Sequence, residues 1–231
     1  MTHIQNIKED NSMSISQAIA QIMQEIGPVT RLVAVTKTKP LNLLQEAYEA
    51  GCKLFGENKV QEMAEKQEQL PKDIAWHMIG HLQTNKVKYI APFVALIHSV
   101  DSLKVLQEIN KQAAKNNRVI ECLLQIHIAE EESKFGFSRE EVNELLDSEE
   151  LTVLNNVRIV GLMGMATNTD SETQIRKEFK GLRTLFDSLK ARETDRVTMR
   201  ELSMGMSGDY RIAVEEGSTL VRVGSAIFGA R

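Results

Sequence analysis

This sequence has few cysteines and no cluster of positive charge. Each of these features excludes some classes of protein. Cys52 and Cys122 are too few for a disulfide framework, and nothing at the N-terminus resembles a signal peptide, so a reducing cytosol is expected. The 28 basic and 32 acidic residues include no basic block, which argues against nucleic acid as a partner. No apolar run approaches membrane-spanning length. We therefore expect a soluble cytoplasmic protein without a membrane partner.

The 231 residues also contain no Pro/Gly/Ser-rich linker and no break in composition, which predicts one domain over 1–231. Short β-branched runs alternate with amphipathic stretches along the whole chain. Eight strands separated by helices predict parallel βαβ units closed into a TIM-type (β/α)8 barrel. The expected strands are 31–36, 53–56, 75–79, 95–99, 119–127, 158–164, 199–203 and 219–223, and the main expected helices are 42–50, 59–69, 102–116, 139–147 and 171–192.

The two ends of the chain suggest how this barrel is sealed. The sequence stops at Arg231, a few residues after the eighth strand, which leaves no room for a final covering helix. Within 1–26, Ile15, Ile19 and Ile22 recur at helical spacing. We expect this N-terminal helix to cover the gap where strands one and eight meet.

Function in such barrels sits at the carboxyl ends of the strands, and the first strand leads to Lys37. Leu32 to Val35 form an apolar run, and Pro40 breaks the strand after the lysine. An amine that lies among apolar neighbours is a usable nucleophile for Schiff base formation with an aldehyde. The alternative is a solvated strand-end lysine beside a second one, Lys39.

The second and third strands end in residues of less specific meaning. After Gly56, Asn58 is expected to cap the next helix, a role compatible with facing a ligand. His77 and His81 are four residues apart, but Gly80 interrupts the run and no third ligand is evident, so zinc is not expected. His77 is interpreted as a strand residue with a satisfied ring, and His81 as a residue near a ligand.

Glycines and serines follow the last strands, and a helical stretch is expected from about Asp209. Barrels often bind phosphate in the loops after strands seven and eight, where glycines expose backbone N–H groups and serines add hydroxyl donors. The methionines at 163, 165, 204 and 206 are explained as flexible filling of irregular gaps. The segments SMGMS (203–207) and VRVGSA (221–226) together predict a phosphate site that includes Ser203, Gly205, Ser207, Gly224 and Ser225.

Arg222 interrupts the apolar run of the eighth strand. Its side chain either snorkels outward between helices or points inward as a charged donor beside a ligand. A lysine amine and a phosphate site together suit pyridoxal 5′-phosphate (PLP), which needs a lysine for its aldehyde and donors for its phosphate. A barrel aldolase that uses Lys37 on a phosphorylated sugar is an alternative.

Six motifs, in order, closely resemble the PLP homeostasis proteins, also called PROSC or YggS-like proteins. This resemblance implies a barrel similar to the N-terminal domain of alanine racemase, with PLP bound to Lys37 as an internal aldimine. It also implies that Ser203, Ser207, Gly224 and Ser225 surround the phosphate, that Arg222 faces the pyridine nitrogen, and that the pocket is lined by Asn58, His81, Met165, Met204 and Met206. The motifs are VAVTKTKP (33–40), FGENKVQE (55–62), WHMIGHLQTNK (76–86), GLMGMAT (161–167), LSMGMSGDY (202–210) and GSTLVRVGSAIFG (217–229).

The function implied by the resemblance is PLP binding, buffering and delivery in vitamin B6 homeostasis, without substantial turnover. An arginine at the ring nitrogen can only donate a hydrogen bond, which weakens the electron sink that PLP enzymes use. A racemase-like enzyme with weak activity on amino acids is the alternative. The expected partners are PLP and apo PLP-dependent enzymes, a monomer is expected, and Lys134 is either solvated or a second PLP site.

Overall fold

The computed structural model describes residues 13–132 and 135–230. Eight parallel strands follow one another in sequence order around a closed barrel, and the last strand pairs with the first. The predicted (β/α)8 barrel and its eight strands are thereby confirmed. The strands are β1 (Arg31–Val35), β2 (Leu54–Glu57), β3 (Ala75–Met78), β4 (Leu96–Val100), β5 (Ile120–Ile126), β6 (Val157–Gly164), β7 (Val197–Ser203) and β8 (Leu220–Val223).

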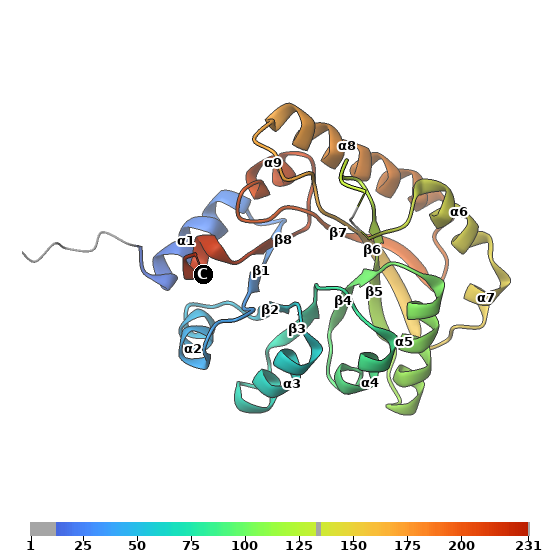
Figure 1. The fold of residues 1–231 in the computed structure, drawn as a ribbon, viewed down its shortest axis with the longest axis horizontal. Coiled ribbons are helices and arrows are strands. Elements are labelled where there is room, and N and C mark those ends of the chain that lie inside the picture. Colours follow the sequence, from blue (N-terminus) through green and yellow to red (C-terminus); the bar gives the residue numbers. More distant parts are fainter. Residues whose placement is uncertain (1–12, 133–134, 231) are drawn as a thin grey trace, which may run out of the picture.

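Helices surround these strands on the outside of the barrel (Figure 1). The five main predicted helices are present, and their starts lie within one residue of the expected positions. The sequence does not predict α4, α7 and α10, because a single turn is too short to show a hydrophobic period. The helices are α1 (Ile15–Ile26), α2 (Leu41–Glu49), α3 (Val60–Gln69), α4 (Val87–Ile90), α5 (Leu103–Lys115), α6 (Arg139–Asp147), α7 (Glu149–Thr152), α8 (Glu172–Leu189), α9 (Tyr210–Glu215) and α10 (Ser225–Phe228), with 3-10 turns η1 (Thr84–Lys86) and η2 (Lys190–Arg192).

Serine residues begin four of these helices. Ser14, Ser102, Ser138 and Ser171 are N-caps whose side chains each accept a backbone N–H from the first turn. At Ser14 and Ser138 the residue three positions later bonds back to the N-cap and completes a capping box. These local signals explain why the starts of α5, α6 and α8 can be located from sequence.

The helix α1 packs against β1, α2, α9 and α10, and thus lies beside the segments that precede and follow β8. Its buried face consists of Ile15, Ala18, Ile19, Ile22 and Ile26. Its last turn is joined to α9, because Glu25 accepts hydrogen bonds from Tyr210 and Arg211. The bonds from Arg211 and Tyr210 lower the pKa of Glu25 to about 2. Residues 1–12 of the predicted N-terminal helix lie outside the described residues.

The barrel interior and the layer outside it carry separate apolar cores. Side chains alternate along each strand, so in β1 Val33 packs inside while Leu32 and Ala34 pack outside against helices. Polar residues in phase with the inner residues therefore point into the barrel. The inner core consists of Val33, Leu96, Leu123, Val160, Met163 and Leu220.

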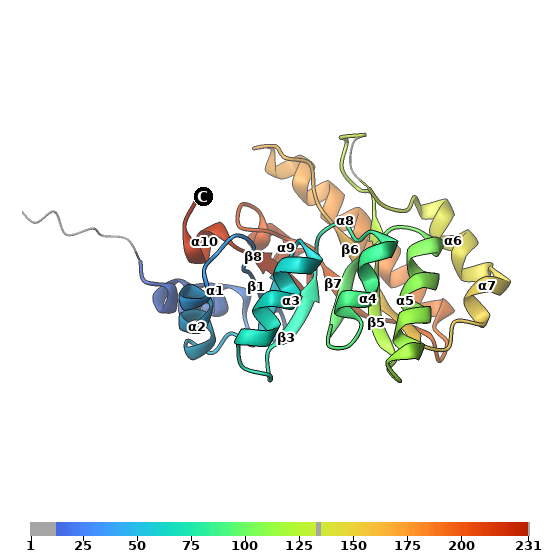
Figure 2. The same cartoon turned by 60° about the horizontal axis from the view of Figure 1, so that its bottom comes forward.

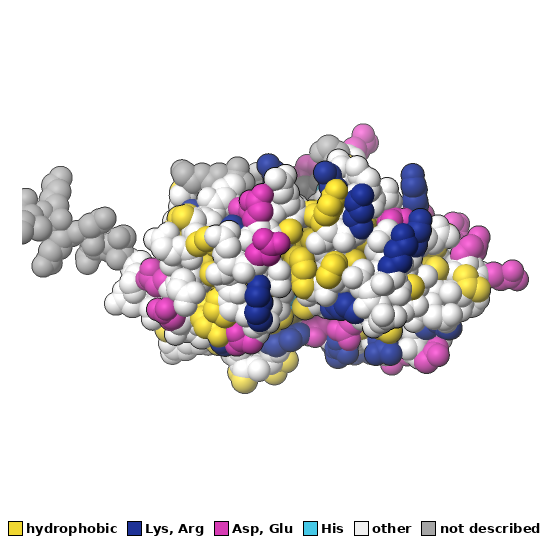
Figure 3. Space-filling model, turned by 90° about the horizontal axis from the view of Figure 1, so that it is seen from below, with side chains coloured by type: hydrophobic (Ala, Val, Ile, Leu, Met, Phe, Trp, Pro, Cys, Tyr) yellow, Lys and Arg dark blue, Asp and Glu magenta, His cyan; other side chains and the backbone are white. Residues whose placement is uncertain are grey.

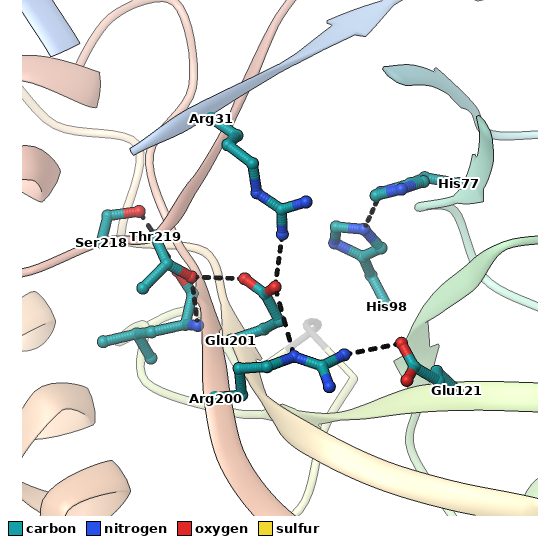
Figure 4. A network of polar contacts seen from close by, with 9 residues as sticks. Arg31, His77, His98, Glu121, Arg200, Glu201, Ser218 and Thr219 are labelled. Atoms are coloured by element: carbon teal, nitrogen blue, oxygen red, sulfur yellow. Dashed lines mark hydrogen bonds and ion pairs between the residues drawn. The ribbon is translucent and has the colours of Figure 1, made fainter. Parts of the chain in front are cut away.

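Ion pairs lie at one end of the barrel, and long loops project from the other. Near the amino-terminal ends of the strands, Glu201 pairs with Arg31 and accepts a hydrogen bond from Thr219 (2.8 Å), and Arg200 pairs with Glu121 (2.7 Å; Figure 4). At the other end, the loops that follow β5 and β6 project to the upper side of Figure 2.

Within the described residues, no helix has the length and apolar character needed to cross a membrane.

Candidate functional site

Lys37 follows β1 at the carboxyl end of the barrel. The preceding residue, Thr36, donates its N–H to the Gly56 carbonyl of β2 (3.0 Å) and its hydroxyl to Glu57 (2.6 Å) on the outer side. Val35, the last residue of β1, is in phase with the inner residue Val33, and Lys37 lies two residues further along, in the turn before α2. Lys37 is half-buried, and its ammonium group has no hydrogen bond or ion pair to any residue in 13–132 or 135–230. Among the described residues, the amine therefore has no competing partner.

The neighbouring Lys39 is engaged by the C-terminal segment. Its Nζ atom donates to the carbonyl groups of Phe228 (3.4 Å) and Gly229 (3.3 Å). Of the two lysines that follow β1, Lys37 is thus the one whose amine is unpartnered among the residues that the structure describes.

Arg222 points into the barrel, which is the inward of the two orientations that the sequence allowed. Only 3% of the residue is exposed, and its guanidinium donates to Ser203 Oγ and to the Gly164 carbonyl (3.2 Å). Burial lowers the pKa of Arg222 to about 10, against the opposing influence of Asp209, so it remains a cation at neutral pH. These bonds use two of the five N–H donors of a guanidinium, and the others can serve a ligand.

Two buried histidines, His98 and His77, continue the series of polar contacts that begins with Arg222 and Ser203. Ser203 Oγ lies 2.8 Å from His98 Nδ1. His98 Nε2 in turn lies 2.9 Å from His77 Nδ1, as Figure 4 shows. Burial is the main cause that lowers the pKa of His77 to about 3 and the pKa of His98 well below its ordinary value. Both rings are therefore neutral at pH 7. His77 is the satisfied strand histidine that the sequence predicted.

The loop after β7 meets the residues after β8 at Ser207. Ser207 Oγ accepts the backbone N–H groups of Gly224 (3.2 Å) and Ala226 (3.4 Å). Gly224 lies against β1, where a Cβ atom would come within 3.2 Å of Val35. Gly205 has a φ of +103°, a conformation that favours glycine. The loop thus gathers a hydroxyl and backbone N–H groups, the donor types of a phosphate site.

The serines that the sequence assigned to one phosphate site lie in different parts of the structure. Ser225 is the first residue of α10, directly after its N-cap Gly224, but Ser203 is the last residue of β7 and pairs in register with Leu220. Gly224 follows Leu220 by four residues, about 13 Å along the strand. The structure thus separates Ser203 from the loop that carries Ser207, and a role for Ser203 beside the phosphate stays a prediction. The Ser203 hydroxyl lies in the barrel interior with Arg222.

The three predicted pocket methionines occupy different environments. Met165 is half-buried against the inner core, and Met206 is exposed at the loop after β7. Met204 is fully buried in the outer core, between the strands and the helices. Met204 therefore packs away from the barrel interior, and the pocket role of Met165 and Met206 stays a prediction.

Asn58 and His81 lie beyond the ends of β2 and β3. The predicted capping role of Asn58 is wrong, because Lys59 is the N-cap of α3 and makes no side-chain capping bond. Gly80 packs so closely on this segment that a Cβ would lie 2.3 Å from the Asn58 carbonyl oxygen. The His81 ring stacks on Phe135 at 4.5 Å. His81 Nδ1 lies 3.3 Å from a carboxylate oxygen of Asp101.

Asn58 and His81 also line a groove of about 560 Å³ beside α3. Figure 3 views this side of the molecule, where hydrophobic side chains are exposed between α3 and α4 with Lys or Arg side chains on either side. The groove includes Val60, Tyr89 and Lys86. Lys134, the predicted alternative PLP site, lies outside the described residues and stays a prediction.

Sequence reasoning missed His98 and a buried ion pair between Glu57 and Lys66. His98 is a single polar residue within an otherwise apolar strand, a pattern with several explanations. Lys66 carried a clearer signal: with Val60 and Met63 it recurs every third residue on the buried face of α3. A lysine in that phase requires a buried partner.

Comparison with known proteins agrees with this geometry. The family model described as alanine racemase, N-terminal domain, matches residues 11–231. The pyridoxal phosphate homeostasis protein of Aquifex aeolicus is 43% identical over 202 residues, covering 87% of each chain. That of Vibrio alginolyticus is 42% identical over 207 residues, covering 87% of this chain and 86% of the relative.

The chain belongs to the pyridoxal phosphate homeostasis protein family. Among solved structures, PipY of Synechococcus elongatus with PLP bound superposes with a TM-score of 0.85 at 34% identity, covering 94% of this chain and 100% of PipY. Alanine racemase from Bartonella henselae gives a TM-score of 0.73 at 18% identity and is covered over 58% of its length. The racemase likeness therefore concerns the fold.

Proposed function

We propose that this protein binds PLP in the cytoplasm, forms a Schiff base to it through Lys37, and buffers or delivers it to apo PLP-dependent enzymes. The observation that carries the proposal is the unpartnered amine of Lys37 at the same end of the barrel as the Ser207 loop. The PipY structure, which was solved with PLP bound, supports the same ligand for this chain.

The residues present fit PLP. Ser207 Oγ accepts hydrogen bonds from two backbone N–H groups, and a phosphate oxygen can accept such bonds in the same way. Arg222 presents guanidinium donors that suit an unprotonated pyridine nitrogen, which is an acceptor. When bound, PLP supplies an aldehyde for the lysine amine and, in enzymes, an electron sink. Lys37, Ser207, Gly224 and Ser225 would hold it, with Arg222 at the ring.

The same residues argue against efficient catalysis. Arg222 stays charged at neutral pH. A guanidinium donates hydrogen bonds but cannot accept one, so it cannot keep a ring nitrogen protonated. A protonated ring nitrogen strengthens the electron sink on which carbanion chemistry depends. We therefore propose a carrier without substantial racemase, transaminase or decarboxylase turnover.

The first test is the visible absorption of the protein after incubation with PLP, followed by borohydride reduction and mass mapping of the modified lysine. We expect a Schiff base band and an adduct on Lys37 in the wild type. Lys37→Ala should lose both while retaining the fold and some non-covalently held PLP. Lys39→Ala is the control and should behave as wild type. An adduct that persists at this site in Lys37→Ala would contradict the assignment.

A second measurement separates carrier from enzyme. The loaded protein is incubated with both enantiomers of several amino acids, and products are followed by chiral chromatography. A kcat within the ordinary enzyme range of ~1–10³ s⁻¹ would overturn the carrier proposal. Transfer of PLP to an added apo-enzyme faster than its release into buffer would support it.

A further inference from the structure

A buried charged cluster lies directly behind Lys37, on the outer side of the barrel wall. It consists of Glu57 at the end of β2 and of Glu62 and Lys66 on α3, and we call it the α3 charge cluster. The side chain of Glu57 is fully buried, that of Lys66 is 8% exposed and that of Glu62 is 23% exposed. Burial raises the pKa of Glu57, and the bond from Lys66 opposes that rise.

Lys66 is the centre of the cluster. Its Nζ atom lies 2.7 Å from each of three oxygens, which belong to Glu57, Glu62 and the Thr36 carbonyl. An ammonium group has three N–H donors, so every one has an acceptor. One of these three acceptors is the backbone of the residue immediately before Lys37.

The residue immediately after Lys37 is held by the same cluster. Thr38 donates its backbone N–H to Glu62 Oε1 at 2.6 Å. Thr38 has a φ of +62°, a left-handed conformation that a β-branched residue adopts only when its surroundings impose it. On the other side, the Thr36 hydroxyl donates to Glu57 Oε1 at 2.6 Å. Both peptide neighbours of Lys37 are thus tied to one ammonium–carboxylate group.

We propose that Glu57, Glu62 and Lys66 are positioning residues that fix the backbone on both sides of Lys37 and so direct its amine into the barrel mouth. The inference rests on the proposed function. In the reaction, the amine nitrogen forms a C=N bond to the aldehyde carbon, and the aldehyde oxygen leaves as water with the two amine protons. Reaction between held groups depends steeply on their placement, and a 1 Å displacement can reduce it about 100-fold.

A purely structural role for the cluster would look different. Attachment of α3 to the barrel requires only apolar contacts, and α3 already supplies Val60 and Met63. Apolar contacts cannot accept the Thr38 N–H or donate to the Thr36 carbonyl. The cluster has no hydrogen bond or ion pair with the Lys37 side chain, and its bonds reach the backbone of Thr36 and Thr38 instead.

The test uses Glu62→Ala, with Glu65→Ala as a matched control on the exposed face of the same helix. Glu62→Gln, which keeps an oxygen acceptor for Thr38, is the conservative variant. The rate of Schiff base formation is measured by absorbance, and non-covalent PLP binding is measured for each variant in a Lys37→Ala background. Amide hydrogen exchange of residues 36–39 is measured without PLP.

We expect Glu62→Ala to slow Schiff base formation about 10–100-fold, as a misplaced amine would. It should leave non-covalent affinity in the Lys37→Ala background unchanged and accelerate exchange of the Thr38 amide. Glu62→Gln should recover much of the loss, and Glu65→Ala should match wild type. Unchanged Schiff base formation in Glu62→Ala, or an equal loss in the Lys37→Ala background, would overturn the positioning role. A wild type that forms no adduct on Lys37 would instead overturn the proposed function, and this inference with it.

Discussion

The two faces of β1 and its neighbours carry polar groups of opposite character. On the outer face, the α3 charge cluster is closed around Lys66, whose three donors all have acceptors within the protein, while Glu57 Oε2 is buried without a hydrogen-bond partner. On the inner face, the amine of Lys37 has no partner among the described residues, and Arg222 keeps donors beyond its two bonds. This difference is what we expect if the closed face fixes the backbone beside Lys37 and the open face presents donors to a ligand.

The largest expected effect comes from breaking the closed face. Lys66→Met leaves Glu57 buried without its cation, and removal of one partner of a buried pair costs about 3–5 kcal/mol. We expect the free energy of unfolding, measured by denaturant titration, to fall by that amount. Glu57→Gln combined with Lys66→Met should recover part of the loss. Lys72→Met, at an exposed lysine just after α3, should change stability by less than about 0.5 kcal/mol. A Lys66→Met protein as stable as this control would mean that the cluster is not closed in solution.

The open face is tested by a smaller change. Ser207→Ala removes a hydroxyl that would donate to a charged phosphate, which costs about 1.5–3 kcal/mol of PLP affinity. Stability should change little, since Ser207 Oγ only accepts two bonds from loop N–H groups. The affinity is measured by equilibrium dialysis in the Lys37→Ala background, where the Schiff base cannot mask the loss. An unchanged affinity would exclude this loop as the phosphate site.

The sequence predicts part of the difference between the inner and outer faces, because side chains along a strand alternate with a period of two. The apolar run of β1 and its end at Pro40 locate Lys37, and Arg222 interrupts a strand at an inward-facing position. The outer cluster was not predicted, because pairing Glu57 with Lys66 requires knowing how α3 packs on β2. The end of β7 at Ser203 was predicted, but the hydrogen bond between Ser203 Oγ and Arg222 was not, because it depends on how β7 and β8 pair.

The smallest effect concerns the neutral histidines of the inner face. The folded-state pKa of His77 is about 3, below the ordinary value of 6.5, so the unfolded chain binds more protons between these pH values. Stability should therefore be fully present above pH 6.5 and fall on acidification, by about 1.4 kcal/mol per pH unit for this residue. His98 acts in the same direction, whereas the raised pKa of Glu57 acts in the opposite one. We expect unfolding titrations at pH 7 and pH 5 to show a shallower loss for His77→Gln than for wild type. Equal losses in the two proteins would mean that His77 is protonated, or exposed, in the folded state.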